Sequence, residues 1–309
     1  MTKPKTGVLV MSYGTPESLE QIEAYYTHIR RGNKPSPEQL KELTDRYKAI
    51  VGGVFPLRAN TDEQAAALDE TLNHRYSDRE FVCYQGLKHA YPFIEEGVKQ
   101  MVKDGIKEAV AVVLAPHYSV MSIGSYIKRA REAAEKEGLE IRFVESYHLH
   151  PALIEAWTAR VNEGLDKFED SEKEKVKVIF TAHSLPEKIV EMNDPYPDQL
   201  LATSHAIAEK AQLSQWQFSW QSAGRTSVSW LGPDILDVLR TLHEEERVGN
   251  VLICPIGFVS EHLEILYDID IECQGLAKDL GMHLERTAML GTDQLYMKTL
   301  SDVIVQQLG

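Results

Sequence analysis

The sequence predicts an α/β protein built from two similar Rossmann-like domains with parallel sheets. Short apolar, β-branched runs alternate with segments whose apolar residues recur at helical spacing, a pattern typical of parallel strands joined by helices. The segments 8–17 (VLVMSYGTPE) and 178–187 (VIFTAHSLPE) also align without a gap, and 111–119 resembles 250–258. We interpret this likeness as an ancient duplication, although convergence of strand–turn–helix units would produce the same pattern.

The strands and helices follow in order along both halves. The predicted strands are 7–13, 81–87, 109–116, 141–147, 176–183, 218–222 and 251–258. After the first strand, Pro16 suits a first helical turn, and Ser18 with Gln21 resembles a capping box. We place the domain boundary near 148–152, which gives an N-terminal domain of 1–148 and a C-terminal domain of 149–309. Packing of the last helix, about 290–309, back on the first domain is left open as an option.

Composition and charge exclude several classes of protein. The chain is 43% hydrophobic and 26% charged, as expected of a globular protein with an ample core, and it contains no apolar run long enough for a membrane span. Three cysteines without C-x-x-C spacing argue against disulfides, structural zinc and an iron–sulfur cluster, and they favour a cytoplasmic location. The net charge of −14 argues against nucleic acid or an anionic membrane as a partner.

A single histidine, His183, closes the predicted strand 176–183, and Ser184 and Pro186 then suit the start of a helix. Open α/β sheets bind their ligands at the carboxyl ends of parallel strands. Imidazole changes charge near neutral pH and binds transition metals. His183 is therefore either a functional group or a histidine that only satisfies a turn. In the alignment of the two halves Tyr13 is its counterpart, which suits a ligand held between two axial groups in a cleft between the domains.

The segment 257–274 is predicted to be an acidic helix. Glu264, Asp268 and Glu272 are spaced by four residues, so they share one face of a helix. Like charges at this spacing cost about a few tenths of a kcal/mol per pair. The row is either a solvated face or a set of oxygen ligands for Fe²⁺ or Mg²⁺.

The segment 26–60 is basic within an acidic protein. Seven basic residues against three acidic ones give it a net charge of +4. This excess would attract an anionic ligand, or it is a chance fluctuation on a solvated helix face. The chain has neither G-x-G-x-x-G after its first strand nor G-x-x-x-x-G-K-[ST], which argues against a dinucleotide or a nucleoside triphosphate as that ligand.

Together these segments resemble the ferrochelatases, enzymes that insert Fe²⁺ into a porphyrin. The strongest match is VIFTAHSLPEKIVEMNDPYPDQL (178–200), and further blocks are WQSAGRTSVSWLGPDI (220–235) and GFVSEHLEILYDIDIEC (257–273). The likeness is greatest to the short enzymes of Gram-positive bacteria that use coproporphyrin III, a tetracarboxylate; YGTP (13–16) and YYTHIRRG (25–32) support this. The resemblance implies a type II chelatase-like fold with a porphyrin cleft between the domains.

The resemblance also implies functions for individual residues. His183 and Glu264 match the catalytic, metal-handling pair on one face of the porphyrin, and Tyr13 matches the axial ligand to the product iron. Asp268 and Glu272, with Arg46, match an outer cation site. The porphyrin-binding positions are Tyr13, Arg30, Arg46, Tyr47, Phe55, Lys88, His89 and Tyr126.

The chain departs from the family pattern at three positions. RYKAIVGGVFPL (46–57) has an extra residue and Phe55 where the family has serine, so a hydroxyl contact to a carboxylate is expected to be lost. Ala223 removes an acidic group from QSEG. Asn193 replaces a glycine, and asparagine tolerates positive φ better than most residues.

The expected reaction is insertion of Fe²⁺ into coproporphyrin III in haem biosynthesis. Neutral His183 would ligate the metal, accept a pyrrole proton, or do both, and Glu264 would hold His183 or take the proton onward. No permanently bound cofactor is expected, although Mg²⁺ fits the acidic helix. The chain is expected to be a monomer that contacts the downstream haem-pathway enzyme transiently. The alternatives are a protoporphyrin IX ferrochelatase, a cobalt chelatase and a non-catalytic haem-binding protein.

Overall fold

A computed structural model describes residues 3–50, 55–224 and 226–309, which form two compact units. The first unit comprises Met1–Tyr147 with Gly291–Gly309, and the second comprises His148–Leu290. The predicted boundary after residue 148 lies one residue from this division. The C-terminal helix, α12 (Gln294–Gln306), belongs to the first unit.

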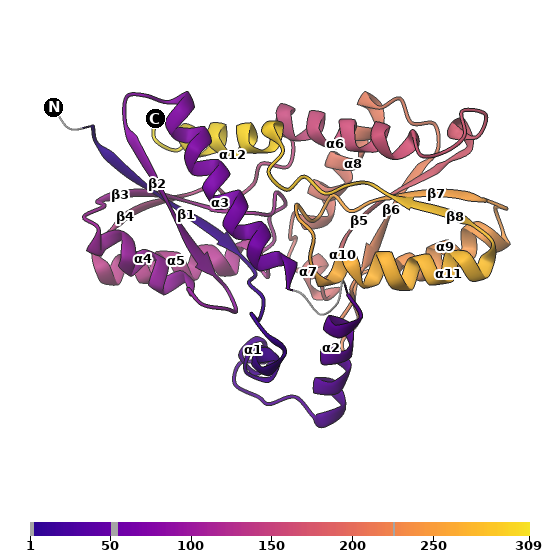
Figure 1. Cartoon of the computed structure of the whole chain (residues 1–309), viewed down its shortest axis with the longest axis horizontal. Coiled ribbons are helices and arrows are strands. Elements are labelled where there is room, and N and C mark those ends of the chain that lie inside the picture. Colours follow the sequence, from indigo (N-terminus) through magenta and orange to yellow (C-terminus); the bar gives the residue numbers. More distant parts are fainter. Residues whose placement is uncertain (1–2, 51–54, 225) are drawn as a thin grey trace. The chain divides into compact units, whose positions relative to one another are not determined.

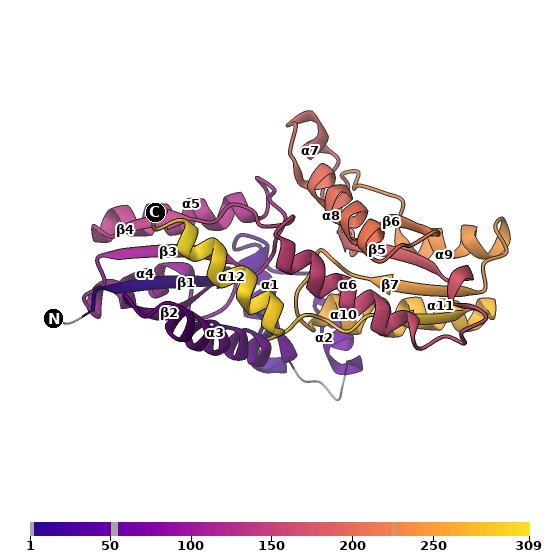
Figure 2. The same ribbon diagram turned by 90° about the horizontal axis from the view of Figure 1, so that it is seen from above.

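The first unit is a four-stranded parallel sheet in the order β2-β1-β3-β4. Helices α3 and α12 cover one face, and α4 and α5 cover the other (Figure 1). Figure 2 shows α12 beside α3. The elements are β1 (Lys5–Ser12), α1 (Ile22–Ile29), α2 (Pro37–Ala49), α3 (Pro56–Arg75), β2 (Glu80–Leu87), α4 (Ile94–Lys103), β3 (Glu108–Val113), α5 (Ile123–Glu137) and β4 (Glu140–Phe143).

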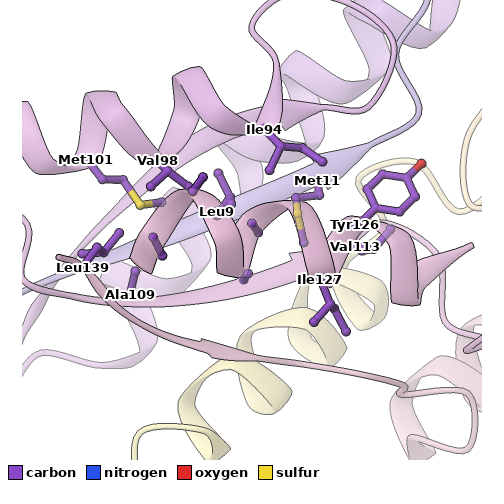
Figure 3. Packing of buried hydrophobic residues seen from close by; sticks show 14 of the residues in the cluster. Leu9, Met11, Ile94, Val98, Met101, Ala109, Val113, Tyr126, Ile127 and Leu139 are labelled. Atoms are coloured by element: carbon purple, nitrogen blue, oxygen red, sulfur yellow. The ribbon is translucent and has the colours of Figure 1, made fainter. Parts of the chain in front are cut away.

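One side of this sheet packs on α4 and α5 through a continuous apolar cluster (Figure 3). Leu9 and Met11 point into it from β1, while Val98 of α4 and Ile127 of α5 meet them from the helices. Tyr126 lies at the end of the cluster, with its hydroxyl pointing away from the apolar side chains. The strand residues are apolar on both faces because both faces are covered by helices.

The second unit repeats the arrangement with the strand order β6-β5-β7-β8. Helices α6 and α8 cover one face, and α9 and α11 cover the other (Figure 1). The elements are α6 (Pro151–Leu165), β5 (Lys177–His183), α7 (Lys188–Glu191), α8 (Tyr196–Lys210), β6 (Trp216–Gln221), α9 (Ile235–Glu244), β7 (Asn250–Cys254), α10 (Leu263–Leu266), η3 (Asp268–Cys273), α11 (Gln274–Leu280) and β8 (His283–Arg286).

The seven predicted strands are all present, and both sheets place their first strand between the second and the third. Strands β1 and β5 therefore occupy the same position in their sheets, and so do β3 and β7, which confirms the predicted equivalence. Strand β8 was not predicted. It has only four residues, and its sequence, HLER, carries no apolar run.

The predicted capping box of Ser18 with Gln21 is wrong. Ser18 makes no side-chain cap, and the Gln21 side chain instead accepts a hydrogen bond from the Glu17 backbone N–H at 3.1 Å. A capping box does occur at α2, where the Ser36 hydroxyl and the Gln39 side chain each bond the other's backbone N–H. Across the described ranges, no helix is long and apolar enough to cross a membrane.

The predicted acidic helix is also not one regular α-helix. Residues up to His262 precede the short α10, and η3 is a π-helix in which the Glu272 N–H bonds the Tyr267 carbonyl at 2.9 Å, five residues back. A π-turn advances the chain by less rotation per residue than an α-turn. The three carboxylates therefore span α10 and η3 instead of one regular α-helix.

Candidate functional site

His183 is the last residue of β5, at the carboxyl edge of the second sheet. Its side chain is one-third exposed. Its Nδ1 bonds the Ser184 carbonyl, and the Tyr196 hydroxyl donates to the His183 carbonyl at 3.1 Å. Because a carbonyl only accepts, Nδ1 carries the proton and Nε2 is left for Glu264.

Glu264, in the first turn of α10, faces this imidazole. Its Oε1 lies 3.5 Å from Nε2 of His183, and its Oε2 lies 3.6 Å from Nε2 of His262. Burial lowers the pKa of His183, but the charge and hydrogen bond of Glu264, with the Ser184 carbonyl and the Asp268 charge, together outweigh burial and raise that pKa to about 9. Burial raises the pKa of Glu264, but the two imidazoles lower it by a larger amount, so that it lies well below its ordinary value. The metal-free pair is thus an imidazolium facing a carboxylate.

A buried polar chain connects this pair to the sheet. The Thr181 hydroxyl donates to Gln221 Oε1 at 2.7 Å, and Gln221 Nε2 donates to the Glu264 carbonyl at 3.0 Å. The next residue, Ser222, has φ +60° and donates its hydroxyl to Asp268. The carboxyl ends of β5 and β6 therefore hold both α10 and η3 in place.

Asp268 and Glu272, the two carboxylates of the predicted outer cation site, both lie in η3 and differ in burial. Asp268 is buried and bonded to Ser222, whereas Glu272 is partly exposed. Over residues 3–50, 55–224 and 226–309, no group of three histidine, cysteine or acidic side chains is placed to hold a metal ion. Ligation by the whole acidic row is therefore not a property of this arrangement. A cation held by one or two carboxylates with water completing its shell remains compatible with it.

The turn after β5 follows the sequence prediction. Asn193 has φ +51°, as its substitution for glycine required. Asp194 then accepts from the Tyr196 N–H at 3.0 Å and so begins α8. This turn brings the Tyr196 hydroxyl to the His183 carbonyl.

Tyr13 directly follows β1 at the carboxyl edge of the first sheet, and its side chain is 42% exposed. Strands β1 and β2 pair with Ser12 opposite Leu87, so Lys88 and His89 emerge beside Tyr13. The Lys88 and His89 N–H groups bond the Ser12 and Tyr13 carbonyls at 2.9 and 3.0 Å. The Tyr13 and His89 rings lie 4.6 Å apart between centroids.

The Lys88 ammonium lies 4.8 Å from the centre of the Tyr126 ring. Burial, with the charges of Arg129 and Arg31, lowers the pKa of Lys88 to about 8. Burial and the Lys88 charge lower the pKa of His89 to about 3, so His89 is neutral. Burial raises the pKa of Tyr126 far above its ordinary value. This edge of the unit thus presents neutral aromatic groups and the Lys88 amine, whose pKa of about 8 lets it lose its proton slightly above neutral pH.

The remaining predicted porphyrin-binding residues lie on or near α1 and α2. Arg30 lies 5.6 Å from the Tyr26 ring centre, and its Nε donates to the Asn33 carbonyl at 3.3 Å. Arg46 and Tyr47 are neighbours on α2, and the Tyr47 hydroxyl is 3.2 Å from that of Thr15. The Phe55 ring packs 4.7 Å from that of Tyr47. Tyr47 and Phe55 therefore contact each other, and the positions between them, 51–54, lie outside the described residues.

Part of the predicted basic patch is neutralised locally. Lys34 pairs with Glu23 at 3.0 Å, Lys41 pairs with Asp45, and Arg58 pairs with Glu17 at 3.3 Å. Glu23 and Glu17 lie outside 26–60 and so offset part of its net charge of +4, whereas Asp45 is already counted in that value.

Sequence reasoning missed three residues next to the predicted ones. His28 Nδ1 lies 3.0 Å from His89 Nδ1, and Arg129 binds both Glu95 and the Lys88 carbonyl. The Trp230 ring lies 6.2 Å from that of His183. His28 and Trp230 fall inside the quoted blocks 25–32 and 220–235, so the signal was present. Arg129 carried none.

The fold is similar to that of solved chelatases. SirB from Bacillus subtilis with Fe³⁺ superposes with a TM-score of 0.62 at 14% identity, covering 98% of this chain and 95% of that one. The sirohydrochlorin chelatase SirB from Bacillus subtilis subspecies spizizenii in complex with cobalt gives a TM-score of 0.58 at 13% identity, covering 98% and 95%. At such low identity these structures show the fold alone.

The sequence then places the chain within this class. The family model for ferrochelatase matches residues 5–308, so the chain belongs to the ferrochelatase family. It is 50% identical to the coproporphyrin III ferrochelatase of Halalkalibacterium halodurans, covering 100% of this chain and 99% of that protein. It is 48% identical to coproporphyrin III ferrochelatase 1 of a Bacillus cereus strain, covering 99% and 98%.

Proposed function

We propose that this chain inserts Fe²⁺ into coproporphyrin III to form Fe-coproporphyrin III (coproheme) in haem biosynthesis. The observation that carries the proposal is identity of about half the residues, over nearly the full length, to proteins named coproporphyrin III ferrochelatases. The His183–Glu264 pair at the sheet edge supports it, because insertion needs a metal ligand and an acceptor for the two pyrrole protons.

The state of the pair refines the expected chemistry. The sequence-based expectation was a neutral His183, but beside Glu264 the metal-free imidazole is protonated. Binding of Fe²⁺ at Nε2 must therefore release that proton, since a metal and a proton compete for the same lone pair. Glu264 is the nearest carboxylate to receive it or to balance its loss.

In the first unit we propose that Tyr13 becomes the axial ligand of the product iron and that cationic side chains bind the porphyrin carboxylates. Lys88 and Arg30 supply these charges from the carboxyl edge of the sheet and from the end of α1. Arginine suits carboxylates through its planar, bidentate geometry. Contacts with remote carboxylates can also supply the binding free energy that bends the macrocycle and exposes a pyrrole nitrogen.

The remaining predictions belong to the same proposal. We propose that the chain acts as a cytoplasmic monomer, passes its product through transient contact with the downstream haem-pathway enzyme and needs no resident cofactor. Asp268 and Glu272 would bind Mg²⁺ or incoming Fe²⁺ as an outer site. The predicted porphyrin cleft between the domains stays a prediction.

The test compares anaerobic Fe²⁺ insertion into coproporphyrin III and into protoporphyrin IX, followed by loss of the metal-free porphyrin spectrum. A higher kcat/KM for coproporphyrin III is expected. Equal or reversed values would indicate a protoporphyrin enzyme, and preference for Co²⁺ in direct competition would indicate a cobalt chelatase. Binding of coproheme without any consumption of metal-free porphyrin would indicate a haem-binding protein.

Arg30→Ala is expected to weaken binding of coproporphyrin III more than binding of protoporphyrin IX. A hydrogen bond to a charged group contributes about 1.5–3 kcal/mol, which corresponds to a loss in affinity of about 10- to 150-fold. Fluorescence-quenching titrations of both metal-free porphyrins measure it, with Lys128→Ala on α5 as the control. Equal losses for the two porphyrins would contradict recognition of the additional carboxylates.

Affinity for metal-free coproporphyrin III is expected to fall as pH rises through about 8, the pKa of Lys88. An anion favours the protonated amine, so the decline approaches about tenfold per pH unit above that pKa. Because the folded-state pKa lies below the ordinary 10.5, the same titration makes the fold more stable as pH rises from about 8 to 10.5. Lys88→Arg stays charged and should flatten the binding curve; an unchanged decline would exclude Lys88 as its source.

Asp268→Asn and Glu272→Gln together are expected to raise the KM for Fe²⁺ by about 10-fold, since outer carboxylates at a metal site typically contribute about 10–100-fold. The KM for the porphyrin should stay constant. Steady-state kinetics at varied Fe²⁺ measure this, with Asp237→Asn on α9 as a control for the loss of a carboxylate charge. An unchanged KM for Fe²⁺ would show that both side chains are only solvated or structural and do not bind the metal.

A further inference from the structure

A fully bonded arginine stands behind the segment that carries Glu264. Arg286 is the last residue of β8, and its side chain is only 15% exposed. Its Nε and Nη2 donate to the two Asp270 oxygens at 2.7 and 2.8 Å. Its Nη1 and Nη2 donate to the two Glu261 oxygens at 3.2 Å, and Nη1 also donates to the Thr287 carbonyl at 3.0 Å. All five N–H donors of the guanidinium are therefore in use.

The two carboxylates that it binds flank the metal-handling residue along the chain. Glu261 lies three residues before Glu264, and Asp270 lies within the π-helix, two residues from both Asp268 and Glu272. Between them the backbone changes from extended at His262 to α-helix and then to π-helix. Such a short, irregular segment gains little stability from its own hydrogen bonds, so contacts with the sheet position Glu264. These contacts come from Gln221 and Ser222 at the end of β6, and from Arg286 at the two ends of the segment.

The anchor itself is rigid. Arg286 pairs with Ile253 in the β7–β8 ladder, and the Thr287 N–H bonds the Ile253 carbonyl at 3.0 Å. A second hydrogen bond joins β8 to the first residue of α11, directly after the π-helix. Gln274 Nε2 donates to the Leu284 carbonyl at 2.9 Å. The guanidinium therefore connects the loop before α10 and the π-helix to the sheet that also carries His183 on β5.

The charges of this segment also favour a role for Arg286 in holding it. The segment 261–272 contains five acidic residues, namely Glu261, Glu264, Asp268, Asp270 and Glu272. Arg286 pairs with two of them, Glu261 and Asp270, and its single positive charge offsets one of the five negative charges. Without it, five carboxylates would repel one another and offer additional, unproductive oxygen ligands.

We propose that Arg286 is a positioning residue for metal insertion, which fixes Glu264 against His183 by holding Glu261 and Asp270 in two bidentate pairs. The inference rests on the proposed function. Arg286 does not touch metal or porphyrin, and it acts only through the segment that it holds. Lysine cannot replace it, since an ammonium has three donors and no planar fork.

The test compares Arg286→Lys with Arg160→Lys, whose guanidinium pairs with Glu163 on the surface of α6. Both variants are assayed well below their thermal unfolding midpoints. For Arg286→Lys we expect kcat/KM for Fe²⁺ to fall about 10- to 100-fold, as for other outer-shell partners of metal ligands, with the dissociation constant for metal-free coproporphyrin III unchanged. Arg160→Lys should match the wild type in both measurements.

Retention of kcat/KM for Fe²⁺ by Arg286→Lys, or an equal loss of porphyrin affinity, would overturn the inference. If Arg286→Lys does not fold, Asp270→Asn breaks one of the two pairs and should show the same selective loss. If wild-type protein inserts no metal, the proposed function fails, and a crystal structure of the variant then tests the positioning by itself. A Glu264–His183 distance that stays at 3.5 Å would overturn it, and a longer distance would support it.

Discussion

Replacing His183 by alanine is expected to reduce iron insertion by about 100- to 10,000-fold, the range associated with loss of a positioned acid–base group. The imidazole ends β5 at the carboxyl edge of the second sheet, and an imidazole is able both to ligate a transition metal and to exchange a proton. Its Nε2 faces Glu264, while Nδ1 is held by a backbone carbonyl, so no other atom of this residue can substitute.

The measurement is anaerobic addition of Fe²⁺ to the variant with coproporphyrin III, followed by loss of the metal-free porphyrin spectrum. Circular dichroism checks that the fold is intact. His205→Ala is the matched control, because that exposed histidine packs on Trp216, the first residue of β6, away from the sheet edge that carries His183. Unchanged turnover of a folded His183→Ala protein would refute the assignment.

Glu264→Gln is expected to lower kcat/KM for Fe²⁺ by about 10- to 100-fold while leaving the shape of the site intact. Burial lowers the pKa of His183, and the charge and hydrogen bond of Glu264 are the largest of the effects that raise it to about 9, so removing the carboxylate should return that pKa toward or below 6.5. NMR titration of the metal-free protein measures the shift, and Glu163→Gln on α6 serves as the control. A His183 pKa that stays near 9 would show that another group controls it.

The same pair makes stability depend on pH. His183 has a raised pKa, so its contribution is complete below about 6.5 and is lost as pH rises through about 9. Glu264 has a lowered pKa, so its contribution is present above about 4.5 and is lost as pH falls. The pair therefore stabilises the fold most between about pH 4.5 and 6.5. Thermal unfolding at about pH 5.5 and 10 should show this difference in wild type, and Glu264→Gln should reduce it.

The sequence located most of these residues because the relevant signals are local. A β-branched run that ends in a histidine and a proline predicts a strand whose last residue lies at a sheet edge, and β5 ends at His183. The gapless match of the two halves placed Tyr13 at the corresponding point after β1. Asn193 at positive φ was predicted from the backbone preference of one residue type.

Where the sequence reasoning failed, contacts between distant parts of the chain decided the structure. Helical spacing predicted one regular α-helix through the acidic row, but Ser222, just after β6, and Arg286, on β8, hold Asp268 and Asp270 within a π-helix. Strand β8 was missed because a short strand is stabilised by its neighbour β7 more than by its own residues.

By itself, then, the sequence determined two parallel α/β halves, the histidine and the tyrosine at their sheet edges, and membership of the ferrochelatase family. Only the tertiary structure decided that Glu264 faces His183, that this imidazole holds a proton in the metal-free state, and that Arg286 pairs with two of the five neighbouring carboxylates. The physical reason is that strand and turn preferences act within a few residues. The charge state of a side chain depends instead on which groups folding brings within a few ångströms of it.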